Sequence, residues 1–152
     1  MNTHIFFEVA ARYDKLDDKG VVRLFTEQFI VQAASFTQAE ALATRALMPL
    51  ASGAFRVVKE KISNISEVIT TTVTAADKFY KVKHSVVTVD EKTGQERMCP
   101  QYLLFQATSN DDAHSRYDAY MQDSFADTEL EAISETKFVD YITEHNTSKN
   151  EK

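Results

Sequence analysis

The sequence is poor in cysteine, glycine, proline and tryptophan. Its 152 residues include one Cys, three Gly, two Pro and no Trp. The single cysteine, Cys99, excludes an intramolecular disulfide, so the hydrophobic core has to hold the fold, as in proteins of a reducing compartment. The few scattered glycines leave no glycine-rich phosphate loop. We therefore expect a cytoplasmic protein that lacks a nucleotide-binding loop of that kind.

Long apolar runs and an excess of basic charge are also missing. No stretch approaches the roughly 18 consecutive apolar residues of a membrane span, and the N-terminus shows no secretion signal. Lys and Arg number 17 against 23 Asp and Glu, and the resulting net charge of −6 argues against binding along an extended nucleic acid. Residues 1–73 hold 8 basic and 8 acidic side chains, whereas residues 74–152 hold 9 and 15. The second half therefore carries the whole acidic excess.

What the sequence does contain is an internal repeat. With a shift of 73 residues Val9 aligns with Val82 and Asp17 with Asp90, and with a shift of 74 Ser35 aligns with Ser109. The matches keep one order of turn, strand and helix, which indicates a diverged duplication. We predict a single domain over residues 1–145, built from repeat units at about 4–70 and 77–143, followed by a flexible tail at 146–152.

Each half predicts the order strand, turn, strand, helix, strand. In the first half we expect strands at about 4–15, 21–34 and 54–62, and in the second half a third strand at about 128–135. Thr37 and Glu40 predict a capping box at the start of the first helix, and Asn110–Asp112 predicts the start of the second. The Thr-rich segment 68–74 is either an extra strand or a linker. This order predicts an α+β fold of two tandem pseudo-symmetric units, with one or two antiparallel sheets and the helices on one side.

Apolar stripes indicate which faces pack together. The first helix presents Ala39, Leu42, Ala43, Ala46, Leu47 and Leu50, and the second presents Ala113, Tyr117, Tyr120, Met121 and Phe125. The sheet positions expected to face these helices are Phe7, Val9, Ala11 and Tyr13 in one half and Tyr80, Val82, His84 and Val86 in the other.

The opposite sheet face is also partly apolar. It carries Phe6, Ile30, Phe79, Tyr102 and Leu104. A monomer seldom exposes so apolar a face, so we expect it to meet a protein partner, a second copy of the chain or a ligand. Phe6, Ile30 and Leu104 are the predicted interface residues.

Basic side chains on this face suggest an anion site. Lys81 and Lys83 are two residues apart and so lie on one face of their strand, beside Phe79 and Tyr102. Arg12 lies on the same face in the first half. Cations neutralise phosphate and aromatic rings stack on bases, so the set predicts binding of a small anionic ligand or nucleotide. The alternative is that these are ordinary strand residues, which keep the sheet soluble and discourage edge pairing.

Catalytic and metal-binding patterns are weak. The four histidines are scattered, and Asp111-Asp112-Ala113-His114 suits a helix N-terminus better than a metal site. His84 suits a hydrogen-bonded or edge histidine better than a general base, and Cys99 has no evident histidine partner. We expect no catalytic residue, no metal and no cofactor.

Four segments resemble an uncharacterised family. They are Phe79-Tyr-Lys-Val-Lys83, Val89-Asp-Glu-Lys-Thr-Gly94, Ser35-Phe-Thr-Gln-Ala-Glu40 and Ile133-Ser-Glu-Thr136. Over most of residues 4–142 the chain is similar to a domain-of-unknown-function family of Bacteroidetes and the phages that infect them. The resemblance implies a source inside a bacterial host cell and implies no activity.

Three functional hypotheses follow from the sequence. The leading one is a small non-enzymatic binding or assembly protein that uses the open sheet face for self-association or for a protein partner. The second is a small-ligand binder of phage origin, which sequesters a nucleotide signal in a pocket between the units or between subunits. The third, an enzyme of unrecognised type, would need a cluster of polar groups that the linear sequence does not show.

Overall fold

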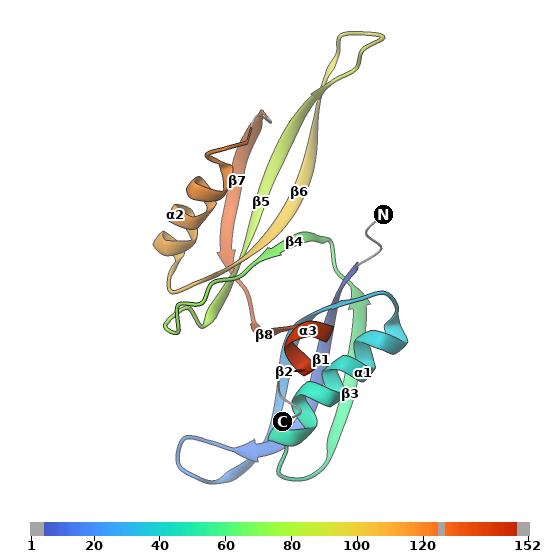
Figure 1. Ribbon diagram of the computed structural model, residues 1–152, viewed down its shortest axis with the longest axis vertical. Helices are drawn as coiled ribbons and strands as arrows, with labels where there is room; N and C mark the ends of the chain where they lie inside the picture. The colour runs from blue at the N-terminus through green and yellow to red at the C-terminus, as the bar shows by residue number, and fades with distance from the viewer. Residues whose placement is uncertain (1–4, 125–126, 149–152) are drawn as a thin grey trace. The chain divides into compact units, whose positions relative to one another are not determined.

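The computed structural model describes residues 5–124 and 127–148, and its strands and helices form two compact units. The first unit comprises residues 1–63 and 137–152, and the second comprises residues 64–136. Each contains a four-stranded sheet with a long helix on one face (Figure 1). The predicted α+β class, with two similar sheet units, is therefore confirmed.

The first unit has the strand order β3-β1-β2-β8. Its strands are β1 (Ile5–Leu16), β2 (Val22–Ala33), β3 (Phe55–Ile62) and β8 (Phe138–Ile142). Its helices are α1 (Phe36–Leu47), a 3₁₀ turn η1 (Met48–Leu50) that contains Pro49, and α3 (Glu144–Ser148). Residues 146–148, expected in a flexible tail, thus belong to a short helix. The Asn146 side chain fastens its start by donating to the Tyr141 carbonyl at 2.8 Å.

The second unit has the strand order β4-β6-β5-β7. Its strands are β4 (Ile65–Ile69), β5 (Lys78–Val89), β6 (Glu96–Ala107) and β7 (Thr128–Glu135), and its helix is α2 (Asn110–Met121). The Thr-rich segment therefore contributes only its first residues, 68 and 69, to a strand, and the rest is loop.

The two units exchange their last strands. β4 follows the first three strands and α1 in sequence but pairs with β6 of the second sheet, and β8 follows the second set but pairs with β2 of the first. Both exchanged strands run parallel to their neighbours, so the sheets are mixed and the prediction of antiparallel sheets is wrong for these two strands. The compact units consequently differ from the repeat units read from the sequence.

The hairpins of the two units share one register. Val9 pairs with Phe29 in the first, and Val82 pairs with Leu103 in the second, which are the positions that the repeat aligns. Both sheets have a β-bulge at the same place, between residues 10 and 11 and between residues 83 and 84. Both hairpin turns contain a glycine with positive φ, 77° at Gly20 and 69° at Gly94, a conformation that side chains with a Cβ rarely adopt.

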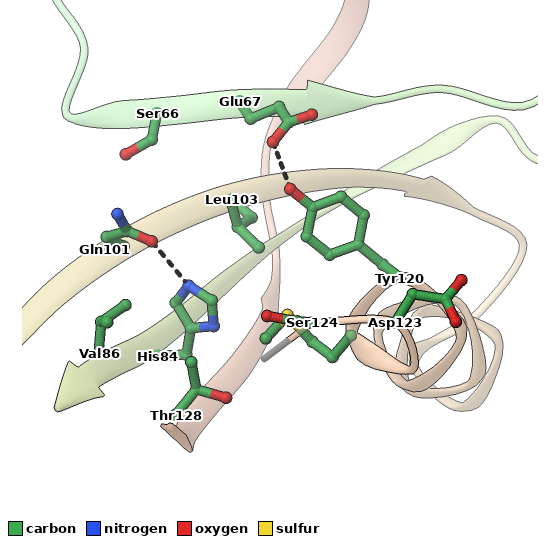
Figure 2. A pocket seen from close by; sticks show the side chains of 11 residues that line it. Ser66, Glu67, His84, Val86, Gln101, Leu103, Tyr120, Asp123, Ser124 and Thr128 are labelled. Carbon is green, nitrogen blue, oxygen red and sulfur yellow. Dashed lines mark hydrogen bonds between the residues drawn. The ribbon is translucent and has the colours of Figure 1, made fainter. Parts of the chain in front are cut away.

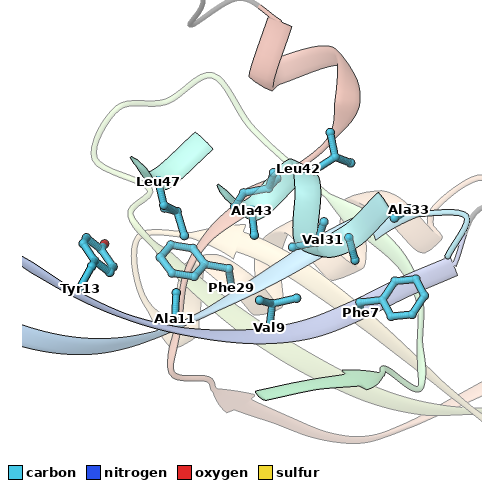
Figure 3. Close-up of a cluster of buried hydrophobic side chains, with 12 residues drawn as sticks. Phe7, Val9, Ala11, Tyr13, Phe29, Val31, Ala33, Leu42, Ala43 and Leu47 are labelled. Carbon is cyan, nitrogen blue, oxygen red and sulfur yellow. The ribbon is translucent and has the colours of Figure 1, made fainter. Parts of the chain in front are cut away.

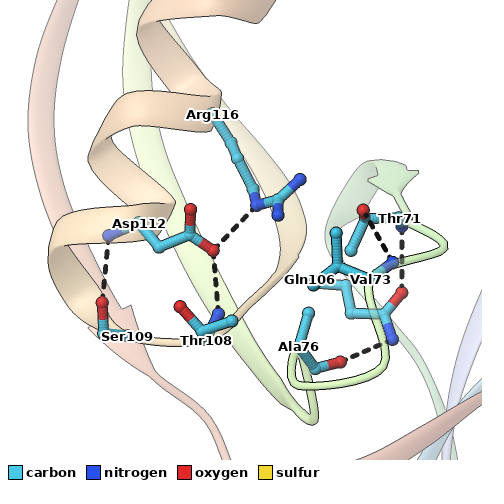
Figure 4. Close-up of polar contacts among 8 residues, drawn as sticks. All are labelled: Thr71, Val73, Ala76, Gln106, Thr108, Ser109, Asp112 and Arg116. Carbon is cyan, nitrogen blue, oxygen red and sulfur yellow. Dashed lines mark hydrogen bonds and ion pairs between the residues drawn. The ribbon is translucent and has the colours of Figure 1, made fainter.

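Both long helices begin with an equivalent pair of polar side chains. Ser109 caps α2 by accepting a hydrogen bond from the Asp112 amide at 3.1 Å, and Asp112 in return accepts one from the Thr108 amide at 2.9 Å (Figure 4). Ser35 and Gln38 repeat this arrangement at α1. The predicted capping box at Thr37 and Glu40 is thus wrong by two residues, and the second helix is capped by the residue before Asn110.

Two matching glutamines fasten the exchanged strands and the segments next to them. Gln32 of β2 accepts a hydrogen bond from the Tyr141 hydroxyl of β8 at 2.8 Å. Gln106 of β6 accepts one from the Thr71 amide and donates to the Ala76 carbonyl, which holds the loop after β4 (Figure 4). The repeated glutamine is therefore part of the scaffold.

The first unit has the larger core, formed between α1 and its sheet (Figure 3). Its buried side chains are Phe7, Val9, Ala11, Tyr13, Phe29, Val31, Ala33, Ala39, Leu42, Ala43, Leu47 and Ile142. The predicted helix-facing positions of β1 are confirmed, but Leu50 is 61% exposed because η1 turns it away from the sheet.

The second unit packs less apolar surface under its helix. α2 buries only Ala113 and Tyr117, against Val82, Leu103 and Phe105 of the sheet and their neighbours. Tyr120, expected in the core, is 39% exposed, and Phe125 lies outside the described residues. This difference leaves space beside the end of α2.

Candidate ligand-binding site

A cavity of about 520 Å³ lies in the second unit, between the end of α2 and the sheet (Figure 2). Its floor is formed by buried His84 and Leu103 with half-buried Val86, Met121 and Thr128. Its exposed rim is formed by Ser66, Glu67, Gln101, Tyr120, Asp123 and Ser124. The cavity therefore combines a partly apolar floor with a polar, acidic rim.

His84 is fixed in one orientation by two hydrogen bonds. Its Nε2 lies 3.1 Å from Gln101 Oε1, and its Nδ1 lies 2.9 Å from the Tyr117 hydroxyl. Because the amide oxygen only accepts, Nε2 carries a proton, and in the neutral ring Nδ1 then accepts from the tyrosine. The side chain is 3% exposed, so neither ring nitrogen is left for a substrate. The expected hydrogen-bonded histidine on the helix-facing side of the sheet is confirmed.

Tyr117 links this histidine to Thr128 on the floor of the cavity. Burial raises the pKa of its hydroxyl, a hydrogen bond with Thr128 opposes that rise, and the charge of Asp118 adds to it. The tyrosine thus stays a neutral donor to His84 over the physiological pH range. This chain of contacts holds the floor of the cavity in place.

Glu67 and Tyr120 form the wall opposite His84. The Tyr120 hydroxyl donates a hydrogen bond to a Glu67 carboxylate oxygen (Figure 2). Burial, followed by that hydrogen bond and the glutamate charge, raises the pKa of Tyr120 to about 12. The Tyr120 ring meets Phe105 edge-on, with ring centroids 5.7 Å apart. The contact joins the exchanged strand β4 to α2 within the second unit.

The matching place in the first unit is filled on its sheet side. By the repeat alignment, Val86 corresponds to Tyr13, Thr128 to Phe55 and Gln101 to Glu27. The Tyr13 and Phe55 rings pack with centroids 5.9 Å apart, and the Tyr13 hydroxyl donates to Glu27. These two rings fill the sheet side of this place, while a cavity of about 550 Å³ remains beside the end of α1, lined in part by Leu47, Leu50 and Asp140.

The residues of the predicted cationic site are divided between the two units. Arg12 lies in the first unit and donates to Thr26, whereas Lys81, Lys83, Phe79 and Tyr102 lie in the second. Lys83 pairs with Glu131 at 3.3 Å. The Lys81 amino group donates to Asn64 at 2.8 Å and lies 4.7 Å from the centre of the Tyr102 ring. These contacts match the alternative reading of the lysines as ordinary strand residues.

The predicted interface residues are buried within the single chain. Their role in an interface stays a prediction, although Phe6 is 9% exposed, Ile30 and Leu104 are 0% exposed, and Phe79 is 2% exposed. Part of the reason for their burial is the strand exchange, since β8 places Tyr141 beside Ile30 and 6.3 Å from the Phe6 ring, and β4 places Val68 beside Leu104.

The described residues, 5–124 and 127–148, contain no group of three or more His, Cys, Asp or Glu arranged for a metal ion. Asp112, in the Asp111–His114 pattern of the sequence, accepts hydrogen bonds from the Thr108 amide at 2.9 Å and from Arg116 at 2.9 Å. His4 lies outside the described residues. Among these same residues, no helix has the length and apolarity needed to cross a membrane.

Sequence reasoning missed most of the cavity residues. Glu67, Gln101 and Asp123 lie far apart in sequence, and the exchange of β4 brings the first of them to the other two. A usable signal was the repeat itself, because polar or smaller residues replace Tyr13, Phe55 and Leu50 at the matching positions 86, 128 and 124.

No curated protein matches the chain in sequence. A family model, described as a domain of unknown function (DUF4494), matches residues 5–145. This range takes in both sheets, both long helices and every residue of the cavity. The chain therefore belongs to the DUF4494 family of domains of unknown function.

Proposed function

We propose that the protein is a small-molecule binding protein, and that the ligand site is the cavity between α2 and the sheet of the second unit. The observation that carries the proposal is the difference between the repeats. Tyr13 and Phe55 fill the sheet side of this place in the first unit, whereas Val86 and Thr128 leave the sheet side open in the second, where the cavity of about 520 Å³ reaches His84. This volume is within the usual range of ligand pockets, roughly 300–1,000 Å³.

Binding is favoured over catalysis by the state of His84. A general base needs a ring nitrogen within reach of the substrate proton. Both nitrogens of His84 are engaged by Tyr117 and Gln101, and the ring is 3% exposed. The histidine therefore serves to position Gln101 at the rim, where the amide can meet a ligand.

The test is a ligand-observed NMR screen of small cationic, anionic and neutral fragments. The screen compares the wild type with two filled variants, in which an added ring occupies the cavity. Val86→Tyr and Thr128→Phe each introduce the ring that the first unit has at the matching position. We expect fragments that bind the wild type to lose at least about tenfold in affinity in each variant.

Thr88→Phe is the matched control, because it adds a ring to an exposed position of the same strand β5 that does not line the cavity. Thermal unfolding shows which variants remain folded, and two independent filled variants guard against the failure of one. Fragments that bind both filled variants as well as the wild type, or a screen without any binder, would overturn the proposal.

A cytoplasmic location and an origin in Bacteroidetes or their phages stay predictions, as does a nucleotide signal as the ligand. A protein partner or a second copy of the chain also stays a prediction. The burial of Phe6, Ile30 and Leu104 removes the exposed apolar face on which that hypothesis rested.

A further inference from the structure

We infer that the ligand of this cavity is a small organic cation, with an amine or amidinium group at the acidic rim and an apolar or aromatic body on the floor. The inference rests on the proposed function and adds the chemical class of the ligand. It draws on three separate features: the charges of the lining, the end of α2 and the shape of the floor.

The lining carries negative charge without a compensating base. Glu67 and Asp123 are its two carboxylates, and among the described residues that line it there is no Lys or Arg. Two basic side chains of the unit form ion pairs with residues outside the lining: Lys83 with Glu131 and Arg116 with Asp112. An anionic ligand would meet uncompensated repulsion here, whereas a cation would be attracted.

The C-terminal end of α2 adds to this negative potential. The helix dipole leaves partial negative charge on the last carbonyl groups, which favours a cation there. α1 meets that preference with Arg45 in its last turn, but the described last turn of α2 has no basic residue. Instead, Asp123 lies two positions after Met121, the last residue of the helix. Its negative charge is unfavourable there, and a bound cation would offset it.

The floor suits an apolar or aromatic body. Val86, Leu103 and Met121 supply apolar surface, and the Tyr120 ring stands at the wall (Figure 2). A tyrosine ring attracts a cation over its face by about 0.5–1 kcal/mol at exposed sites. The Tyr120 ring thus contributes to binding both the apolar body and the cationic group of the ligand. Its hydroxyl keeps Glu67 oriented at the rim.

Three probes of nearly equal size and shape separate charge from shape. Benzamidine is cationic, benzamide is neutral and benzoate is anionic, and each contains one phenyl ring. Titrations followed by protein NMR should show benzamidine binding with a Kd of about 1 mM, benzamide binding at least about tenfold more weakly, and no shifts from benzoate. The shifts should involve the amides of residues 84, 86, 101 and 120–124.

The double variant Glu67→Gln, Asp123→Asn removes both charges while keeping the side-chain sizes. It should weaken benzamidine at least about tenfold and leave benzamide unchanged. Glu91→Gln removes one charge from the exposed hairpin turn of the same unit and should change neither affinity. Adding salt to the wild type should weaken benzamidine alone.

The inference is overturned if benzamide or benzoate binds as tightly as benzamidine, or if benzamidine does not bind at about 10 mM. If the filled variants still abolish binding of some other fragment, the cavity remains a ligand site and only its class changes. If no fragment of any class binds, the proposed function itself fails.

Discussion

At the scale of single residues, His84 shows how a buried polar group can shape a site without reacting in it. We predict that His84→Leu destabilises the protein by about 1–3 kcal/mol, because the buried Tyr117 hydroxyl then loses its acceptor. Adding Tyr117→Phe removes that unpaired group, so the double variant should recover about 1 kcal/mol of the loss. A double-mutant cycle by urea unfolding measures this coupling, and strictly additive effects would contradict the assigned hydrogen bond.

Asp112 gives a pH-dependent prediction. The hydrogen bond from the Thr108 amide, followed by the one from Arg116, lowers its pKa below the ordinary value of 3.8. A carboxyl with a lowered pKa in the folded state contributes stability above its unfolded pKa and loses it as the pH falls through the folded pKa.

Asp112→Asn should therefore cost about 0.5–1 kcal/mol in the free energy of unfolding at pH 7. That difference should shrink as the pH falls from 3.8, where the carboxyl of the unfolded chain is protonated, through the lower pKa of the folded carboxyl. Urea unfolding of both proteins across this range checks it. A constant difference at all pH values would show that the charge is not the cause.

At the scale of elements, the two serine caps are a matched pair. Ser35 and Ser109 each accept a hydrogen bond of 3.1 Å from the amide three residues later. Ser35→Ala and Ser109→Ala should each reduce the free energy of unfolding by about 1 kcal/mol. Thr37→Ala, at the cap that the sequence pattern favours, should cost less, and chemical denaturation of the three variants ranks them. A larger loss for Thr37→Ala than for Ser35→Ala would contradict the observed cap.

Most of the elements could be predicted from the sequence, because they depend on local periodicity and turn chemistry. Alternation placed β1, β2, β3 and β7 within one residue, and Gly20 and Gly94 marked the hairpin turns, whereas β4, β8 and α3 were not predicted. Errors arose where two local signals compete, as at Ser35 against Thr37, or where Pro49 changes the helix geometry and turns Leu50 outward. Local patterns rank such alternatives poorly because they differ by only about 1 kcal/mol.

At the scale of the whole molecule, the strand exchange could not be predicted, and the candidate site depends on it. Ile65–Ile69 aligns with Phe138–Ile142 in the repeat, but alignment does not say which sheet each segment joins. Strand pairing between distant segments is a non-local choice. The presence of Glu67 at the cavity follows from that choice, and so does part of the burial of Ile30 and Leu104.

The strand exchange predicts which unit Ile69 and Ile142 each stabilise, and their positions in the sequence would suggest the opposite units. Ile142, near the end of the chain, is 3% exposed and packs into the core of the first unit, whereas Ile69, at the matching position of the first half, packs against the core of the second. Ile142→Ala should cost about 2–5 kcal/mol, and the half-buried Ile69→Ala should cost less. Hydrogen exchange locates the effect of each change.

Ile142→Ala should speed amide exchange mainly in β1, β2 and α1, and Ile69→Ala mainly in β5, β6 and α2, because each isoleucine supports the sheet that it joins rather than the half that encodes it. Ile142→Val keeps most of the side chain and should give a weaker change in the same amides. If Ile142→Ala instead loosened β5, β6 and α2, each half would keep its own last strand. Glu67 would then lie in the first unit, and the cavity would lose the carboxylate that sets its preference for a cation.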